Sequence, residues 1–221
     1  MLLRKLVAEA IGTALLLAAV VGSGIMAERL AGGNAAIALL ANTIATGAAL
    51  VALLLTFGPI SGAQLNPAVT LAAAWQGGMP WREAAGYVAG QLLGAVAGVL
   101  SAHGMFGEPA LSLSRHARSG GAQWLSELVA TFGLVAVIHG TSRTRPAATP
   151  FAVAAFITSA YWFTASTSFA NPAVTLARSL SDTFAGIRPA DVGPFVLAQL
   201  VGAALASVLF RWLLPPDPRP A

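Results

Sequence analysis

Two asparagines, Asn66 and Asn171, each begin the same seven-residue string, Asn-Pro-Ala-Val-Thr-Leu-Ala, which the chain contains twice. Asparagine is favoured just before a helix and proline at its first position, so each string predicts a helix start. An asparagine oxygen that caps the helix leaves both amide N–H groups as free donors, beside the partial positive charge of the helix dipole. Two such starts that face each other predict a small, donor-rich, electropositive spot.

No set of residues suited to covalent or metal chemistry accompanies these donors. The chain contains no cysteine, which excludes disulfides, thiolate chemistry and cysteine metal sites. The histidines, His103, His116 and His139, are dispersed along the chain and suggest no metal site. The sequence also lacks a nucleotide-binding loop. We therefore expect no catalytic residue, no metal and no cofactor.

Composition indicates the environment of the chain. The 221 residues are 57% hydrophobic and 9% charged, with a mean hydropathy of +0.75, and several apolar stretches are long enough to cross a bilayer. We therefore expect an all-α integral membrane protein in contact with lipid. The net charge of +4 does not predict nucleic-acid binding, because the basic residues are scattered among segment ends instead of forming a patch with aromatic residues.

Six spans and two shorter helices are predicted. The first apolar run is longer than the core of a signal peptide and is interpreted as a retained span, and Gly58-Pro59 is expected to end the second. The helix that opens at Asn66 has roughly 12 residues, about 18 Å, against a hydrocarbon core of about 30 Å, so it crosses only part of the membrane. The spans are expected at about 4–28, 36–57, 82–103, 122–140, 149–166 and 192–213.

The order of elements is written twice. Glu9 and Gln91 of the first half match Glu127 and Gln199 of the second. Each half has three full spans, an odd number, so the second half enters the membrane from the opposite face and the repeat is inverted. The short helices then meet near the midplane, where irregular backbone must be buried by protein or line a water-filled cavity. We expect one domain, 1–221, with halves at about 1–104 and 122–214 joined by a loop at 105–121.

A row of glycines marks the third span. Gly86, Gly90, Gly94 and Gly98 recur every four residues and therefore share one face of a helix. Such a row lets a neighbouring helix approach closely. We expect this face to pack against another span.

The basic residues predict the orientation in the membrane. If both termini are inside, seven of the twelve lysines and arginines lie on the inner side. This excess has the sign that the positive-inside rule requires. We therefore expect both termini in the cytoplasm, with these residues inside: Arg4, Lys5, Arg82, Arg143, Arg145, Arg211 and Arg219.

Together these features resemble the aquaporin, or major intrinsic protein, family. The resemblance covers nearly the whole chain and rests on the span order, on Ser61-Gly62-Ala63, on Glu9 and Glu127, and on the two motifs, Asn66, Pro67, Ala68 and Asn171, Pro172, Ala173. It implies the aquaporin fold: six transmembrane helices plus two re-entrant half-helices in an inverted repeat, with one pore per subunit of a homotetramer.

The resemblance also implies roles for individual residues of the chain. In the family, the two asparagine amides donate to the permeating molecule, while the half-helix dipoles disfavour cations and protons. Carried over to this chain, that role falls to Asn66 and Asn171. Glu9 and Glu127 are intramembrane carboxylates, which are costly unless satisfied. The resemblance implies that they bind the backbone of the re-entrant segments and take no part in transport.

The outer selectivity filter departs from the usual pattern of the family. Its four positions, carried over by spacing, are Thr46, Ser159, Ser168 and Val174. Thr158 or Tyr161 replaces Ser159 if the spacing slips. Small hydroxyl side chains in place of bulky ones predict a wide constriction that is lined by hydroxyl groups.

Val174 is the departure with the clearest consequence. It stands three residues after the second asparagine, where the family almost always has arginine, so a permanent charge and its donors are missing. Arg178 follows one helical turn later. It either snorkels to solvent or binds loop carbonyls, or it returns positive charge to the outer vestibule.

A valine at this position resembles a bacterial subgroup associated with arsenic-resistance gene clusters. This implies a passive channel of the bacterial cytoplasmic membrane for glycerol-like polyols, arsenite and similar neutral metalloid hydroxides, and water. Transport follows the gradient, because no relay of intramembrane acids is present that could couple energy. Two alternatives remain open: a mainly water-selective channel with an atypical filter, and a structural or adhesion role in the membrane.

Overall fold

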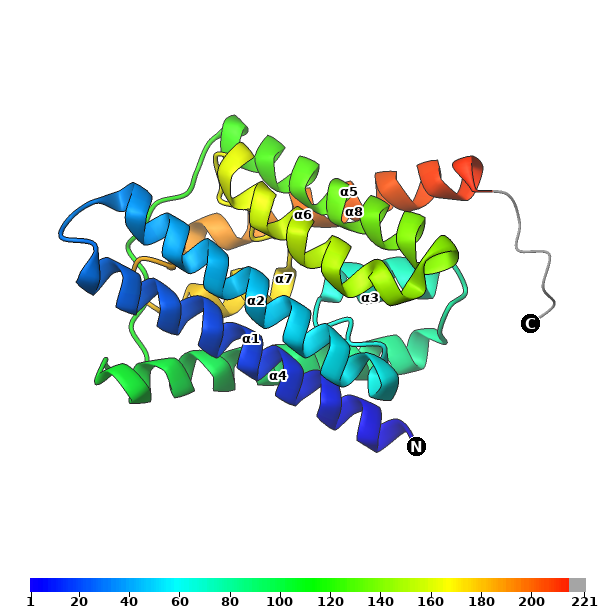
Figure 1. Ribbon diagram of the computed structural model, residues 1–221, viewed down its shortest axis with the longest axis horizontal. Coiled ribbons are helices and arrows are strands. Elements are labelled where there is room, and N and C mark those ends of the chain that lie inside the picture. Colours follow the sequence, from blue (N-terminus) through cyan, green and yellow to red (C-terminus); the bar gives the residue numbers. More distant parts are fainter. Residues whose placement is uncertain (215–221) are drawn as a thin grey trace.

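The computed structural model describes residues 1–214, and these residues form helices joined by turns and extended segments (Figure 1). Two short helices, α3 (Pro67–Trp75) and α7 (Pro172–Arg178), begin at the asparagine motifs, and a 3-10 turn, η1 (Pro146–Ala148), precedes α6. Arg219, one of the basic residues predicted to lie inside, falls outside the described residues. The long helices are α1 (Leu2–Leu30), α2 (Ala35–Ser61), α4 (Trp81–Phe106), α5 (Gly121–Thr144), α6 (Thr149–Phe163) and α8 (Pro189–Leu213).

One predicted boundary and one predicted helix length are corrected by the structure. Helix α2 does not end at Gly58-Pro59 but continues through Pro59 to Ser61. It ends where Gly62 adopts φ 88° and donates its N–H to the carbonyl of Gly58, a left-handed conformation that glycine adopts without strain. Helix α3 ends at Trp75, close to where the sequence predicts, and has 9 residues, fewer than the roughly 12 expected.

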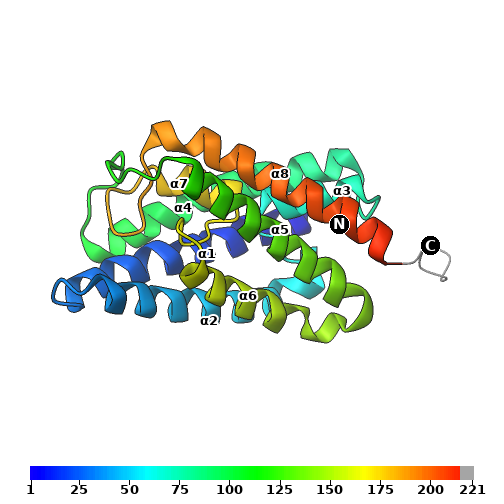
Figure 2. The ribbon, with the colours of Figure 1, turned by 90° about the horizontal axis from the view of Figure 1, so that it is seen from above.

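The two halves of the chain pack in the same pattern. Helix α1 packs against α2 and α4, and α5 packs in the same way against α6 and α8. Each short helix contacts the last long helix of both halves, since α3 and α7 each touch α4 and α8. Helices α1 and α5 begin at opposite ends of the bundle (Figures 1 and 2). The inverted repeat predicted from the sequence is therefore confirmed.

The bundle has two distinct ends. The end that holds Met1 and the end of α8 at Leu213 is called the terminal end, and the opposite end, with the segment 107–120, is called the loop end (Figure 1). Helix α3 runs from the middle towards the terminal end and α7 runs towards the loop end (Figure 2). Each end of the bundle therefore receives one half-helix.

Close helix contact follows the glycine row of α4. A Cβ atom on Gly94 would lie 2.1 Å from the backbone oxygen of Ala10 in α1, and one on Gly98 would lie 2.2 Å from that of Ala14. The second half repeats the contact, since a Cβ on Gly202 of α8 would lie 2.4 Å from the oxygen of Leu128 in α5. The predicted close approach of a neighbouring helix is confirmed, and it draws α1 and α5 tightly against their partners.

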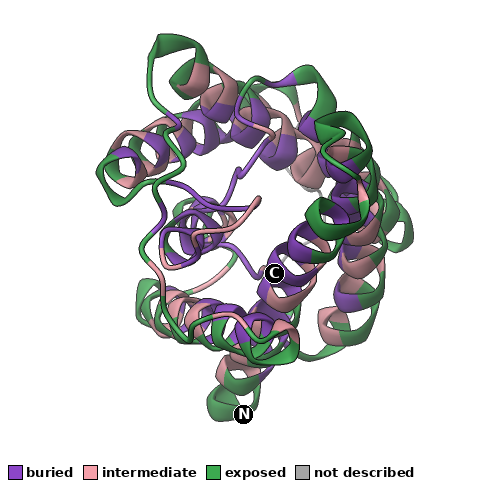
Figure 3. Ribbon diagram, turned by 90° about the vertical axis from the view of Figure 1, so that its left-hand side faces the viewer, coloured by how far each residue is buried: buried purple, intermediate pink, exposed green. Residues whose placement is uncertain are grey.

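Apolar side chains cover the outside of the bundle. Seen from the loop end, the long helices form a ring whose buried residues face inward (Figure 3), while Leu93 and Leu197 are 73% and 64% exposed on the outer faces of α4 and α8. Of the six long helices within residues 1–214, five are long and apolar enough to cross a membrane, and α6 is the shorter one. Helix α6 has 15 residues, about 22 Å, and η1 extends it.

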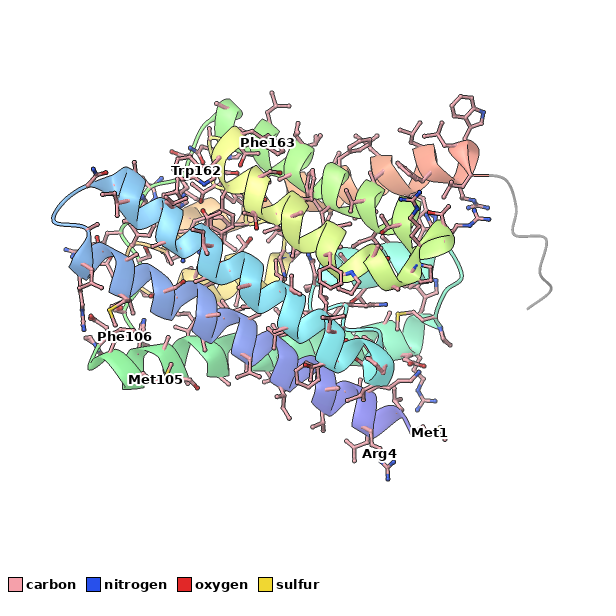
Figure 4. All side chains as sticks on the ribbon, in the orientation of Figure 1. Met1, Arg4, Met105, Phe106, Trp162 and Phe163 are labelled. Atoms are coloured by element: carbon pink, nitrogen blue, oxygen red, sulfur yellow. The ribbon has the colours of Figure 1, made fainter. Side chains whose placement is uncertain are left out.

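Tryptophans mark both ends of this apolar surface. Trp162 lies with Phe163 towards the loop end, whereas Met1 and Arg4 lie at the terminal end (Figure 4). Tryptophan is enriched where a membrane meets water. The protein is therefore an integral membrane protein with an aromatic belt at each end, formed from five exposed residues near helix ends: Trp75, Trp81, Trp124, Trp162 and Trp212.

Candidate functional site: a cavity through the bundle

Both motif asparagines cap the short helices, as the sequence predicts. The side-chain oxygen of Asn66 accepts from the N–H of Ala68 at 2.9 Å. That of Asn171 accepts from the N–H groups of Ala173 at 3.0 Å and Val174 at 3.3 Å. Both asparagines have extended backbone, with φ near −155° and −157°, and proline follows each of them. The local sequence therefore determines where each half-helix begins.

One amide N–H of each asparagine is used by the opposite half of the chain. Asn66 Nδ2 donates to the carbonyl of Ala170 at 2.8 Å, and Asn171 Nδ2 donates to the carbonyl of Leu65 at 2.8 Å. The expectation that both N–H groups stay free is corrected, since an amide nitrogen carries two and one is occupied. Because each acceptor directly precedes the other asparagine, these reciprocal bonds hold the two helix starts together.

Glu9 binds the backbone that leads into α3. Its Oε1 accepts from the N–H of Gln64 at 3.0 Å and from the Ser61 hydroxyl at 2.6 Å. Its Oε2 accepts from the N–H of Leu65 at 2.7 Å and from Gln91 Nε2 at 2.8 Å. The residue is fully buried, so these four donors supply the hydrogen bonds that water would otherwise provide.

Glu127 repeats this arrangement before α7. It accepts from the N–H groups of Phe169 at 2.9 Å and Ala170 at 2.8 Å, and from Gln199 Nε2 at 2.6 Å. These contacts are of the kind that the family resemblance implies for both glutamates. In each half, a buried carboxylate from the first long helix and a glutamine from the last one hold the re-entrant segment in place.

The carboxylates also orient the backbone carbonyl groups. The described chain has no cis peptide bond, and in a trans peptide the N–H and C=O groups point in opposite directions. Because the N–H groups of Gln64 and Leu65 point at Glu9, the carbonyls of Ala63 and Gln64 point away from it. The same reasoning orients the carbonyls of Ser168 and Phe169 away from Glu127. Both segments line a central cavity of the bundle.

Backbone strain accompanies this orientation. Ala63 and Leu65 have φ values of 45° and 49°, and their counterparts Ser168 and Ala170 have 50° and 47°. Left-handed conformations cost non-glycine residues roughly 1–2 kcal/mol each. The strain recurs at equivalent positions of the two halves. It is offset by the hydrogen bonds to the glutamates and by the bonds from the asparagines.

A cavity of about 600 Å³ runs along the centre of the bundle. At the terminal end it is lined by Gln76 and His139, whose Nε2 atoms lie 2.9 Å apart. It passes Asn66 and Asn171 in the middle and reaches Arg178 towards the loop end. Apolar side chains form most of its wall, so the polar groups that face it are few and defined in position. The lining residues include Asn66 and Asn171 and the two re-entrant segments, whose carbonyls point away from the glutamates.

Three of the four predicted filter residues line the cavity. Thr46, Ser168 and Val174 are buried at 3%, 2% and 5% exposure and contribute to its wall. They come from α2, the segment before α7, and α7 itself. Tertiary packing of both halves therefore brings together positions that the sequence separates by more than a hundred residues.

The predicted place of Ser159, the fourth filter residue, is corrected by the structure. It is exposed and absent from the cavity wall, and its hydroxyl donates to the carbonyl of Phe156 at 2.7 Å. Ile157 and Tyr161 line the cavity instead. They are one turn apart, and a residue two positions from each lies about 200° away on the helix. Tyr161 is one of the two alternatives to Ser159 that the spacing allows, and its hydroxyl lies 3.4 Å from Thr46 Oγ1.

Arg178 lies in the cavity wall and not in solvent. It is 2% exposed, its Nε donates to the carbonyl of Ala185, and its guanidinium carbon lies 3.4 Å from the centroid of the Phe169 ring. Of the two structural alternatives, binding to a loop carbonyl is confirmed and snorkelling to solvent is wrong. The sequence patterns did not predict a role for Phe169. Its place two residues before Asn171 could have indicated that it lies beside the cavity.

Comparison with known proteins agrees with this architecture. The family model described as "Major intrinsic protein" matches residues 1–149, more than half of the chain. The chain is also similar in fold to the X-ray structure of the aquaglyceroporin from Plasmodium falciparum, with a TM-score of 0.67 and 23% identity, covering 96% of this chain and 95% of the other. At that identity the similarity supports the fold alone.

Similar sequences extend the comparison beyond the region matched by the family model. Aquaglyceroporin AqpS from Rhizobium meliloti is 58% identical over 97% of this chain and 92% of its own length. Aquaporin Z from Bradyrhizobium diazoefficiens is 31% identical over 96% and 93%, and a probable aquaporin, NIP7-1, from Arabidopsis thaliana is 30% identical over 95% and 76%. The chain therefore belongs to the major intrinsic protein family and is a passive membrane channel for water and small solutes, not an enzyme.

Proposed function

We propose that this channel passes glycerol-like polyols and neutral metalloid hydroxides, arsenite among them, together with water. The observation that carries the proposal is Val174, an uncharged residue in the cavity wall one turn from the Asn171 cap. A relative that is 58% identical is named an aquaglyceroporin, which supports the polyol part of the proposal.

The wall around Val174 is amphipathic. Val174 and Ile157 are apolar, whereas Thr46, Tyr161 and Ser168 carry hydroxyl groups. A polyol has hydroxyls along one edge and C–H groups along the other, so it can satisfy both kinds of wall. Arsenite at neutral pH is an uncharged trihydroxide of similar size and hydrogen-bonding capacity. Tyr161 makes the constriction narrower than the serine predicted from spacing, so selectivity depends on neutrality as well as on width.

The proposal is tested by flux into proteoliposomes. Wild type is compared with Val174→Arg and with Val174→Leu, which changes size without charge. We expect glycerol and arsenite uptake by wild type, and a fall of at least about tenfold in Val174→Arg, equivalent to about 1.4 kcal/mol in the barrier. Val174→Leu is expected to have the smaller effect.

Two outcomes would contradict the proposal. High water flux with glycerol and arsenite excluded from wild type would identify a mainly water-selective channel with an atypical filter. Unchanged solute flux in Val174→Arg would show that this position does not control selectivity.

Mercurial reagents are expected to leave all fluxes unchanged, because the chain has no cysteine to react with.

We also propose a homotetramer in a bacterial cytoplasmic membrane, with the terminal end inside. Two of the relatives named above are bacterial, which supports the location. The described basic residues of the terminal end, such as Arg82 and Arg143, support the orientation. Native mass measurement of detergent-solubilised protein tests the assembly, since a tetramer requires four copies of the 22.3 kDa chain.

A further inference from the structure

Two buried arginines lie around one aromatic ring at the loop end of the cavity. Arg178 and Arg118 are 2% and 8% exposed. Their guanidinium carbons lie 3.4 Å and 5.0 Å from the centroid of the Phe169 ring. Such stacking orients a guanidinium plane and stabilises it by roughly 0.5–2 kcal/mol. Two positive charges are therefore concentrated beside the cavity.

No carboxylate is paired with either charge. Within residues 1–214, the ion pairs join other basic residues to acids, and neither Arg118 nor Arg178 takes part. The acid near Phe169 is Glu127, whose oxygens are already occupied by two backbone N–H groups and by Gln199. A second buried acid, Asp191, accepts from the backbone N–H of Arg118 and pairs with the guanidinium of Arg188, so neither acid bonds the guanidinium of Arg118 or Arg178.

The two arginines have different surroundings. Arg118 belongs to the segment 107–120 and donates to the carbonyls of Gly186 at 2.8 Å and Ser166 at 3.2 Å, so its guanidinium is tied to loops behind the cavity wall. Burial lowers the pKa of Arg118 to about 10, which leaves it charged at neutral pH. Arg178 is part of the cavity wall itself.

Arg178 presents donors to the cavity. The Nε–H of its guanidinium is bound to the carbonyl of Ala185, and its other N–H groups have no hydrogen-bond partner among the described residues. Ser168, whose buried hydroxyl has no partner, belongs to the same cavity wall. Because Arg178 belongs to the cavity wall, its unpaired N–H groups can donate to a molecule in the cavity.

Arg178 lies one helical turn beyond Val174, about 6 Å along α7 towards the loop end. A fixed positive charge beside a narrow, mostly apolar cavity repels cations strongly, because the low dielectric screens it poorly. The charge at 178 can act on cations before they reach the constriction at Val174. It does not occupy the space through which a neutral solute must pass beside Val174.

We propose that Arg178, oriented by Phe169 and by the carbonyl of Ala185, is the residue that excludes cations from this channel. The barrier to charge and the barrier to size are then separated along α7, with charge at position 178 and size at position 174. This inference rests on membership of the channel family and holds whichever neutral solutes pass.

The test compares Arg178→Gln with Arg115→Gln in proteoliposomes. Arg115 is a matched control at the same end of the molecule, because its side chain is 90% exposed and pairs with Asp182 outside the cavity. Sodium and potassium conductance and water flux are measured on the same preparations. We expect at least a tenfold rise in cation conductance for Arg178→Gln with water flux retained, and wild-type values for Arg115→Gln.

A double variant separates loss of charge from loss of structure. Arg178→Gln combined with Val174→Arg returns a guanidinium to α7 one turn deeper, and we expect cation exclusion to return while glycerol flux falls. Wild-type cation conductance in Arg178→Gln protein that still conducts water would overturn the inference. Equal leakage through Arg115→Gln would do the same, because the effect would then belong to surface charge.

A further variant leaves Arg178 in place in case its replacement prevents folding. Ser168→Asp adds a carboxylate to the same cavity wall, so we expect it to raise cation conductance. No rise in folded, water-conducting Ser168→Asp would overturn the inference. Glycerol and arsenite fluxes are scored separately, so failure of the proposed solute selectivity is distinguishable from failure of the cation barrier.

Discussion

The side chains of Asn66 and Asn171 hold the two half-helix starts together at the centre of the molecule. Asn66 and Asn171 each cap their own half-helix and donate one N–H across to the other half. This leaves one N–H on each amide for the cavity, half of what the isolated motif suggests. The donor-rich spot is smaller than predicted, but its two halves are held in a defined relation to each other.

The filter position on α6 can be tested at the level of single residues. We expect Tyr161→Ser to raise glycerol flux several-fold in proteoliposomes, because it removes a phenol ring from the cavity wall. Ser159→Ala is the matched control and should leave flux unchanged, since that side chain is exposed on the outside of the helix. An effect of Ser159→Ala with none from Tyr161→Ser would restore the assignment made from sequence spacing.

At the scale of elements, close packing of α1 on α4 and of α5 on α8 holds the glutamates in position. Glu9 and Glu127 belong to α1 and α5, and their partners Gln91 and Gln199 belong to α4 and α8. The contacts at Gly94 and Gly202 lie one turn from these glutamines on the same helices. Any increase in helix separation therefore weakens the hydrogen bonds that support the re-entrant segments.

The glycine contact gives a prediction for stability. Gly94→Ala places a Cβ 2.1 Å from the backbone oxygen of Ala10, and the helices must move apart. We expect the free energy of unfolding to fall by about 1–3 kcal/mol, the usual cost of overpacking. Gly104→Ala on the same helix has no atom within 4 Å of the added Cβ, so it should be neutral or stabilising by up to about 1 kcal/mol.

Thermal unfolding in detergent measures both changes. Gly202→Ala should resemble Gly94→Ala, because its Cβ meets the equivalent backbone oxygen of Leu128 at 2.4 Å. Equal stability of Gly94→Ala and Gly104→Ala would show that the helices adjust without cost.

At the scale of the whole molecule, the inverted repeat places equivalent features at opposite ends. Each end receives one half-helix and an aromatic belt, and the basic residues are distributed unequally between them. The repeat makes the two ends similar in structure, so orientation in the membrane depends on the small difference in charge.

Orientation can be measured directly, because the chain contains no cysteine and introduced thiols have no background. Ser119→Cys lies in the exposed segment at the loop end, and Ala147→Cys lies in η1 at the terminal end. In intact bacterial cells, a membrane-impermeant maleimide should label the first variant and not the second. Both should react after the cells are lysed. Labelling of Ala147→Cys alone would reverse the proposed topology.

Much of the fold could be predicted from local sequence signals. Apolar length predicted the spans, the Asn-Pro pairs predicted the half-helix starts, and the odd number of spans per half predicted the inversion. Helix ends were less predictable: Pro59 stays within α2 because the helix continues to a glycine that can adopt a left-handed conformation. A proline near the end of a helix removes one donor without determining the last residue.

The sequence by itself determined the chemical identity of the centre of the channel: two asparagine caps, two buried glutamates and an uncharged Val174. These follow from residue type and spacing within one element. Only the tertiary structure decided which side chains face the cavity. Packing of α6 on α2 turned Tyr161 inward and Ser159 outward, and the loops around Phe169 and Ala185 kept Arg178 in the wall. Helix rotation and long-range loop contacts are set by the whole bundle, so spacing along the chain does not contain them.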